Sequence, residues 1–261
     1  MNRVSAAALD FRHRVEDEAR FLETCEGGDP GTPEQSSIWV LGIEPGWSLA
    51  DALADEQEDL RREAQMKQYS VELQMQWRFN RGVFKLLSAI EGSSVDRYVQ
   101  FAERARPFER GSKGYLKANL FPEPFNNVGD WDGAASDATG FCGKAEYRSW
   151  LQKARFAVLR GWIERCRPKL VIGAGLTHLQ DFLDITGTSE APPAHRFEVN
   201  GHGKRLHVAV SGTVPVAIVP HFTGGPHGLN SDESIGAAAD YIRDALQMYC
   251  VRAPTQAAAA I

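Results

Sequence analysis

The chain has 261 residues, of which 43% are hydrophobic, which is enough for a substantial core and excludes a disordered or fibrous protein. Its 29 basic and 34 acidic residues give a net charge of −5, which excludes a global positive field that would attract nucleic acid. A nucleic-acid partner must therefore be bound by a local basic patch.

The four cysteines are scattered, without a CxxC pair or a cluster typical of a zinc or iron–sulfur site, and they indicate reduced thiols. Charged residues run through the N-terminal segment, where a signal peptide would be apolar. No window approaches the roughly 18 apolar residues of a membrane span. We therefore expect a cytoplasmic protein that binds no membrane and acts as a monomer.

Apolar periodicity and Gly/Pro-rich breaks divide the chain into alternating helices and strands. The predicted helices are residues 7–24, 51–65, 71–90, 145–166, 176–183 and 231–249, the last with Ser231 or Asp232 as N-cap. The predicted strands are residues 37–43, 114–122, 168–175 and 215–220, with a hairpin at 196–210 around Asn200 and Gly201. Residues 25–36 and 126–143 are expected to be loops.

This alternation predicts an α/β fold with a mostly parallel sheet covered on both faces. We expect an N-terminal helix and loop at residues 1–36, and one α/β domain at 37–249 with a helical insertion at 50–91. A flexible tail follows at 250–261. In parallel sheets, ligands bind beyond the carboxyl ends of the strands, so the residues at those ends are candidate site residues.

The first strand ends in the turn GIEPG, where the carboxylate of Glu44 stands beside Pro45. Gly42 and Gly46 flank this pair and permit close approach of the backbone to a ligand. Alternatively, Glu44 caps the following helix, because a negative charge is favourable near a helix N-terminus.

The second strand contains Asn119 in the segment KANLFPEPFNN. A buried amide must find partners or cost about 1–3 kcal/mol, and it can donate and accept at once, as reading a pyrimidine edge requires. A core asparagine that ties two loops together is the ordinary alternative. Phe121 and Phe125 are candidates for stacking on a base, although aromatic residues at strand ends also belong to cores.

The fourth strand leads directly into His221 and the glycine-rich segment VPHFTGGPHGLNSDE. A histidine here can donate a hydrogen bond to charge that develops on a leaving group, whereas a lone histidine is also commonly structural. His227 raises metal binding as another alternative, but no third ligand at a set spacing accompanies the two histidines. We therefore expect no metal.

In this order, GIEPG, NLFPEPF and PHFTGG resemble motifs of the uracil-DNA glycosylase superfamily. The nearest likeness is to its single-strand-selective monofunctional branch, whose first motif reads G-M-N-P-G and whose second reads H-N-L-C-P-L. The resemblance covers the layout of residues 37–245 and is specific at the three motifs. It implies a three-layer α/β/α sandwich with a central, mainly parallel four-stranded sheet.

The resemblance implies a role for each motif. Glu44 stands where the family has the Asn or Asp that positions or activates water, Asn119 matches the asparagine that reads the flipped base, and His221 matches the histidine that stabilises the departing base anion. The other implied base contacts are Gly42, Ile43, Pro45, Gly46, Trp47, Phe121 and Phe125. Residues 223–229 match the loop that inserts into DNA, with Thr223, Gly224, Gly225 and His227 as its contacts.

The sequence also departs from the family pattern. Glu44 reaches one methylene farther than Asp, which alters where water is held or leaves room for a different sugar or base. His221 is followed by Phe222 and Thr223, where the family commonly has Pro-Ser. The cysteine spacing of the iron–sulfur branches is absent.

Basic residues concentrate shortly before the Asn119 strand and around the hairpin. They either neutralise DNA phosphates or form a solvated basic face. The candidate phosphate contacts are Arg104, Arg106, Arg110, Lys113 and Lys117, with Lys204 and Arg205 near the hairpin.

The implied activity is that of a monofunctional DNA glycosylase that hydrolyses the N-glycosidic bond of a flipped-out damaged or modified pyrimidine, in single- or double-stranded DNA, without a cofactor. Uracil is the family default, and a hypermodified cytosine of phage DNA, removed in antiviral defence, is a possible extension. The alternatives are a catalytically silent nucleic-acid-binding relative and an unrelated α/β hydrolase or ligand-binding protein. Common motifs of that last class, such as G-x-S-x-G, are absent from the sequence.

Overall fold

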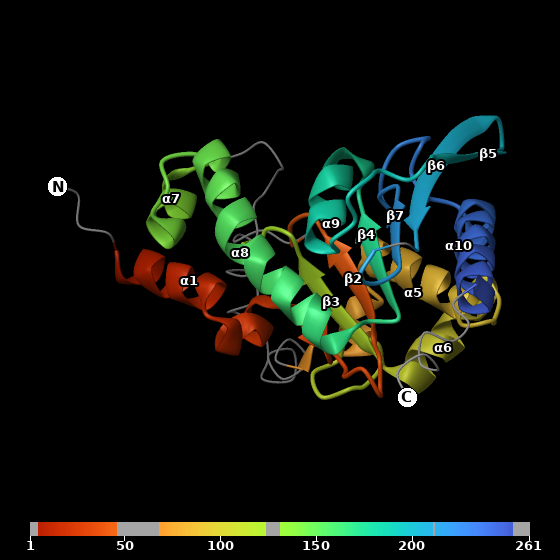
Figure 1. The fold of residues 1–261 in the computed structure, drawn as a ribbon, viewed down its shortest axis with the longest axis horizontal. Coiled ribbons are helices and arrows are strands. Elements are labelled where there is room, and N and C mark those ends of the chain that lie inside the picture. Colours follow the sequence, from red (N-terminus) through yellow and green to blue (C-terminus); the bar gives the residue numbers. More distant parts are fainter. Residues whose placement is uncertain (1–4, 46–67, 124–130, 211, 253–261) are drawn as a thin grey trace, which may run out of the picture.

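The structure, a computed structural model, describes residues 5–45, 68–123, 131–210 and 212–252, with side chains described up to Met248. It contains one seven-stranded sheet in the order β1-β3-β2-β4-β7-β6-β5, with helices packed against it (Figure 1). The strands are β1 (Gly27–Gly28), β2 (Ile38–Gly42), β3 (Tyr115–Asn119), β4 (Leu170–Ala174), β5 (His195–Val199), β6 (His202–Ala209) and β7 (Val216–Val219).

The helices vary widely in length. The α-helices are α1 (Ala6–Glu16), α4 (Val71–Gln74), α5 (Arg78–Ile90), α6 (Tyr98–Ala105), α7 (Gly133–Thr139), α8 (Lys144–Cys166), α9 (Leu179–Ile185) and α10 (Asp232–Arg252). The 3₁₀ segments in the described residues are η1 (Glu18–Thr24), η2 (Val95–Arg97) and η3 (Leu176–His178). None of the helices described is long and apolar enough to cross a membrane.

The predicted α/β class is confirmed, whereas the predicted number of four strands is wrong. The strands β3, β2, β4 and β7 are neighbours in this order and all run parallel. Every residue of these four strands is buried, as expected for apolar runs with helices on both faces. The additional strands pair antiparallel at the two edges, β1 beside β3 and the hairpin β5–β6 beside β7.

Side chains on the two faces of the sheet enter different cores. Trp39 belongs to a core that includes apolar residues of α1, α8 and α9. Val40, the next residue of β2, belongs to a second core with apolar residues of α5, α6 and α10. Figure 1 shows the two groups of helices on opposite sides of the strands. Neighbouring residues thus alternate between faces, as the geometry of a strand requires.

The N-terminal segment is part of the first core. The predicted helix at residues 7–24 is interrupted at Asp17, whose Oδ1 accepts a hydrogen bond from the backbone N–H of Ala19 at 2.9 Å and starts η1. Phe11 of α1 and Phe21 of η1 are both buried in the core that contains Trp39. Residues before Ile38 therefore contribute directly to the packing of the α/β domain.

Several other predicted elements differ from the structure in detail, whereas the predicted hairpin agrees with it. The predicted helix at 71–90 is divided into α4 and α5, and the predicted helix at 51–65 lies outside the described residues. The expected loops at 25–36 and 126–143 contain β1 and α7. The hairpin prediction is confirmed, because positive φ angles at Asn200 (53°) and Gly201 (74°) allow the tight turn between β5 and β6.

Candidate active site

The predicted site residues Glu44, Asn119 and His221 follow three parallel strands at the same edge of the sheet. Asn119 ends β3, and Glu44 lies two residues after the end of β2, the neighbouring strand. His221 lies two residues after the end of β7, which is separated from β2 by β4. The parallel order therefore explains how residues far apart in sequence come to the same edge.

Gly42 makes room for the side chain of Asn119. The two residues are opposite each other in the β2–β3 ladder. A Cβ atom at position 42 would lie 2.3 Å from Asn119 Oδ1, closer than any side chain allows. The predicted close approach at Gly42 is thus to a neighbouring side chain of the site, which any larger residue would displace.

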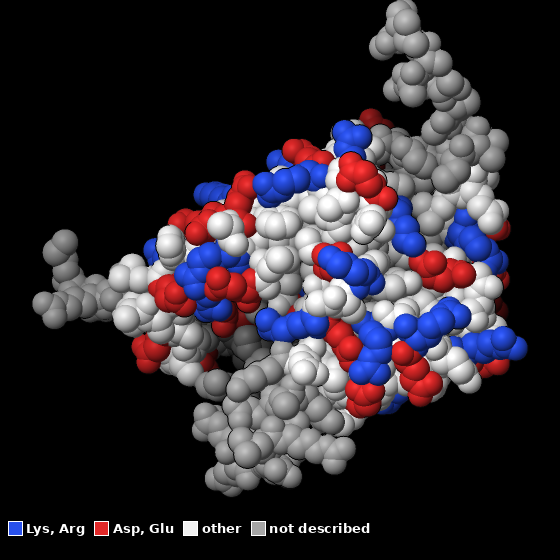
Figure 2. Space-filling model, turned by 90° about the horizontal axis from the view of Figure 1, so that it is seen from below, with Lys and Arg blue, Asp and Glu red and all other residues white. Residues whose placement is uncertain are grey.

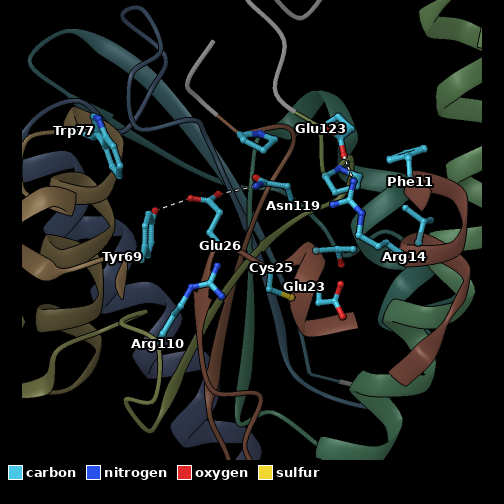
Figure 3. A pocket seen from close by; sticks show the side chains of 14 residues that line it. Phe11, Arg14, Glu23, Cys25, Glu26, Tyr69, Trp77, Arg110, Asn119 and Glu123 are labelled. Carbon is cyan, nitrogen blue, oxygen red and sulfur yellow. Dashed lines mark hydrogen bonds and ion pairs between the residues drawn. The ribbon is translucent and has the colours of Figure 1, made fainter. Parts of the chain in front are cut away.

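Asn119 opens into a pocket with a volume of about 200 Å³, shown in Figure 3. A cavity of about 150 Å³ can hold benzene, so this pocket has room for a single six-membered ring. Its walls are formed by residues from α1, η1 and the β1 region, from both sides of α4, from the segment between α6 and β3, and from the ends of β2 and β3. They are Phe11, Arg14, Val15, Glu23, Thr24, Cys25, Glu26, Pro45, Tyr69, Trp77, Arg110, Asn119, Pro122 and Glu123.

A network of polar side chains surrounds Asn119, and its centre is Glu26. Asn119 Nδ2 donates to Glu26 Oε1 at 2.6 Å, while Tyr69 OH donates to Glu26 Oε2 at 2.6 Å (Figure 3). Lys117 Nζ lies 2.7 Å from Glu26 Oε2, 2.7 Å from Tyr69 OH and 2.7 Å from Asn80 Oδ1. The base-reading candidate is therefore held by a carboxylate that is itself held by a lysine and a tyrosine.

Charge in this network is balanced within the protein. Burial alone would raise the pKa of Glu26, but the ammonium of Lys117 and the hydrogen bonds from Lys117, Tyr69 and Asn119 outweigh it and lower the pKa. Burial lowers the pKa of Lys117, and the Glu26 carboxylate partly offsets this effect. The two groups lie 2.7 Å apart, which is the geometry of a buried ion pair.

Glu44 forms ion pairs with two cations of helix α8. Lys144 Nζ lies 3.0 Å from Oε2, and Arg148 Nη2 lies 2.9 Å from Oε1. Only 6% of the Glu44 side chain is exposed. The Glu44 carboxylate therefore connects the end of β2 to the first turns of α8. The position of Glu44 in the sequence did not indicate this contact. Pro45, the next residue, lines the pocket.

His221 has the hydrogen bonds of a neutral imidazole that can donate from Nε2. The backbone N–H of Thr223 donates to Nδ1 at 3.3 Å, and Thr223 Oγ1 lies 2.8 Å from the same nitrogen. Burial lowers the pKa of His221 below its usual value. Because Nδ1 accepts, the proton of the neutral ring resides on Nε2.

Phe79, at the start of α5, connects the histidine with the polar network. Its ring centroid lies 5.1 Å from that of His221, and Lys117 Nζ lies 5.1 Å from the same Phe79 ring. The predicted site residues did not include Phe79, Glu26, Tyr69 or Trp77. A Glu beside two glycines, in the segment CEGG, was the one available signal for Glu26, and it was assigned to a loop.

Several predicted base contacts have other roles or lie outside the described residues. The Phe121 side chain is fully buried among Tyr147, Phe156 and His178, so the prediction that it stacks on a base is wrong. Ile43 packs against the first core. Gly46, Trp47 and Phe125 lie outside the described residues.

The basic stretch before β3 does not form a uniform phosphate-binding face. Lys117 is only 5% exposed and is paired with Glu26, so the prediction that it contacts DNA is wrong. Arg106 is paired with Glu72 at 2.8 Å and with Glu109 at 2.6 Å. Acidic and basic side chains are interspersed on the face shown in Figure 2.

Two other predicted phosphate contacts differ in position. Lys113 lies two residues before β3, at the amino end of the strand, about 13 Å or more from Asn119 at a strand rise of about 3.3 Å per residue. Lys113 Nζ lies 3.4 Å from Asp29 Oδ1. Arg110 is exposed and lines the pocket, so it stays a candidate for ligand contact.

The predicted DNA-inserting loop is anchored to β6. Lys204 Nζ donates to the carbonyl oxygens of Pro226 at 2.8 Å and Gly228 at 2.7 Å, and His227 Nδ1 lies 2.8 Å from Gly203 O. Thr223, Gly225 and His227 are exposed, and Gly224 is partly buried beside His221. Lys204 is thus a structural residue of this loop rather than a free surface charge.

The described residues contain no group of three His, Cys, Asp or Glu side chains that could hold a metal ion. Comparison with known proteins adds no identity: no protein-family model matches the chain, and no curated protein matches its sequence.

Proposed function

We propose that this protein is a monofunctional DNA glycosylase that hydrolyses the N-glycosidic bond of a flipped-out pyrimidine and leaves an abasic site. The observation that carries the proposal is the position of Asn119 in a ring-sized pocket, at the sheet edge where Glu44 and His221 also lie. An amide that donates and accepts suits a pyrimidine edge, and the target must leave the duplex to reach such a pocket.

The two other residues suit the charges of the reaction. Cleavage of the glycosidic bond generates positive charge on the sugar and negative charge on the leaving base. In the proposed mechanism, Glu44 orients a water molecule and stabilises the sugar cation. His221 donates a hydrogen bond from Nε2 to the departing base, which its neutral tautomer supports. The reaction requires no metal or cofactor.

The proposed substrate is a damaged or modified pyrimidine in single- or double-stranded DNA. Uracil is the default that the resemblance implies, and a hypermodified cytosine in phage DNA, removed in antiviral defence, is its extension. We further propose that the protein is a cytoplasmic monomer. We also propose that its layers form an α/β/α sandwich, and the two cores on opposite faces of the sheet support this arrangement.

The test is incubation with DNAs that each carry uracil, an oxidised pyrimidine or a phage-type cytosine, scored for abasic sites. The wild type should produce abasic sites on at least one of them. The Asn119→Ala variant should discriminate less between bases, with thermal melting as a control, because Asn119 is buried and partnered with Glu26. Complete absence of abasic sites on the whole panel would contradict the proposal.

A second candidate is a catalytically silent nucleic-acid-binding relative. The double ion pair of Glu44 favours it, because a carboxylate held by Lys144 and Arg148 has part of its charge neutralised. Binding to the panel DNAs without any abasic product would support this candidate over the enzyme.

A further inference from the structure

The direction of the Asn119 amide decides what the pocket can recognise. An asparagine amide has a carbonyl oxygen that accepts and an NH₂ group that donates, and rotation by half a turn exchanges them. Uracil-type rings carry an acceptor at C4 beside an N3–H donor. Cytosine-type rings carry an amino donor at C4 beside an N3 acceptor. For one orientation of the ring in the pocket, a fixed amide therefore satisfies only one of these two classes.

Glu26 removes the freedom of that amide. An ionised carboxylate accepts hydrogen bonds and cannot donate them, so the group that faces Glu26 Oε1 at 2.6 Å must be the NH₂ of Asn119. The amide oxygen then lies on the side of Gly42, where the absence of a Cβ atom leaves room for it. Apart from the bond to Glu26, the Asn119 amide makes no side-chain hydrogen bond with the described residues.

Glu26 is itself held in place from its other oxygen. Tyr69 OH and Lys117 Nζ both contact Oε2, at 2.6 Å and 2.7 Å, and leave Oε1 to the amide. The backbone of this segment is fixed as well, because Glu26 N donates to Lys117 O at 3.0 Å where β1 pairs with β3. A Cβ atom at Gly27 would lie 2.0 Å from Phe108 O, so the close approach of β1 to the backbone of Phe108 requires a glycine at position 27.

We propose that Glu26 is a positioning residue that sets the base specificity of the pocket by fixing the direction of the Asn119 amide. This inference rests on the proposed glycosylase function and adds a specificity determinant to it. Glu26 acts through Asn119 on the edge of the pyrimidine ring. Its replacement by a residue that can both donate and accept lets the amide turn.

The test uses matched DNAs that differ only in the amino or keto group at C4, cytosine against uracil and 5-hydroxymethylcytosine against 5-hydroxymethyluracil. The measurement is the ratio of kcat/KM within each pair. The wild type should prefer one class by about 10- to 100-fold, the scale of a well-formed bidentate contact. A ratio near one for the wild type would overturn the inference, even with high activity.

The variant is Glu26→Gln combined with Lys117→Met, because Glu26→Gln alone would leave a buried lysine without its anion. This double variant should bring the ratio towards one, with a smaller effect on the rate for the preferred base. The matched control is Tyr69→Phe, which removes a hydrogen bond to Oε2 but keeps the contact of Oε1 with Asn119. The control should keep the ratio of the wild type, although its melting temperature falls.

Hydrogen exchange of the Asn119 side-chain amide, followed by NMR, separates the inference from the proposed function. One amide proton should exchange slowly in the wild type and in Tyr69→Phe, and rapidly in the double variant. If the wild type excises no base, the proposed function fails, and slow exchange that depends on Glu26 would still support the positioning role. Rapid exchange in the wild type, or an unchanged ratio in a folded double variant, would overturn it.

Discussion

Glu44 Oε2 lies 3.0 Å from Lys144 Nζ, and only 6% of the Glu44 side chain and 9% of the Lys144 side chain are exposed. The pair joins the carboxyl end of β2 to the first turn of α8, so Glu44 has a structural contact at the position that we assign to catalysis. The two roles make different predictions for variants of the two partners.

We predict that Glu44→Gln lowers the excision rate at least about 100-fold, because it removes the negative charge that orients water and faces the sugar. Lys144→Met breaks the same ion pair but leaves the carboxylate with Arg148. It should therefore lower the melting temperature and keep most of the activity. Single-turnover excision and thermal melting of both variants test this, and equal losses of activity would assign Glu44 to structure alone.

We predict that His221→Ala lowers the excision rate at least about 100-fold without unfolding the protein, since it removes the donor to the departing base. Thr223→Val is the matched control, because it removes the hydroxyl beside Nδ1 and keeps the imidazole. The control should have a clearly smaller loss. Full activity of His221→Ala in single-turnover excision would contradict the assigned role.

Glu123 should make stability depend on pH in an unusual direction. Burial raises the pKa of this pocket carboxyl, more than Arg14 and Arg155 lower it. The native state therefore favours the protonated form, and the stability that it contributes is present below the unfolded pKa and lost as the pH rises through the native pKa. Glu123→Gln should raise the melting temperature at pH 8 relative to the wild type, and the gain should shrink towards pH 4.

Glu23 is the control for this pH effect. A hydrogen bond from Arg20 lowers the pKa of Glu23, so its contribution to stability is present above the unfolded pKa and lost as the pH falls. Glu23→Gln should thus lose stability at pH 8 and approach the wild type towards pH 3. Parallel pH profiles for the two variants would contradict the assignment of opposite shifts.

Lys204 and its neighbour Arg205 should affect DNA binding differently. Arg205 is exposed, and Arg205→Met should reduce the slope of log K against log salt by about 0.7–0.9 if this residue neutralises one phosphate. Lys204→Met should leave the slope unchanged, because its ammonium is bound to Pro226 O and Gly228 O. It should instead accelerate amide exchange in residues 224–228. A reduced slope for Lys204→Met would show that its charge reaches DNA.

The main strands were predictable because their signal is apolar sequence. β2, β3, β4 and β7 lie within predicted strands, and their parallel order gives the shared edge at which Glu44, Asn119 and His221 were expected. The number of strands was not predictable in the same way. β1 consists of Gly27 and Gly28, which pair through the backbone and carry no side-chain periodicity.

The partners of the site residues were largely hidden from the sequence. Lys117 was expected at the surface as part of a basic stretch. Its buried partner Glu26 immediately precedes β1, and the segment that contains both was predicted to be a loop, so the sequence did not indicate the pairing. Phe121 was a candidate for base stacking because an aromatic residue at a strand end can either stack on a base or belong to the core. Its packing against Tyr147 shows that it belongs to the core. Local patterns indicated the candidate site residues, but contacts across the sheet determine their surroundings.

The guanidinium of Arg155, which is fully buried, donates to Asn119 O at 3.0 Å and to Thr24 Oγ1 at 2.6 Å. The strand that carries the Asn119 amide is thereby joined to the N-terminal segment, which also supplies Glu26 and Phe11 to the pocket. A chain cleaved between Ser36 and Ser37 would be a complex of two fragments. Its pocket would form only on their association, and its ligand affinity would then depend on protein concentration.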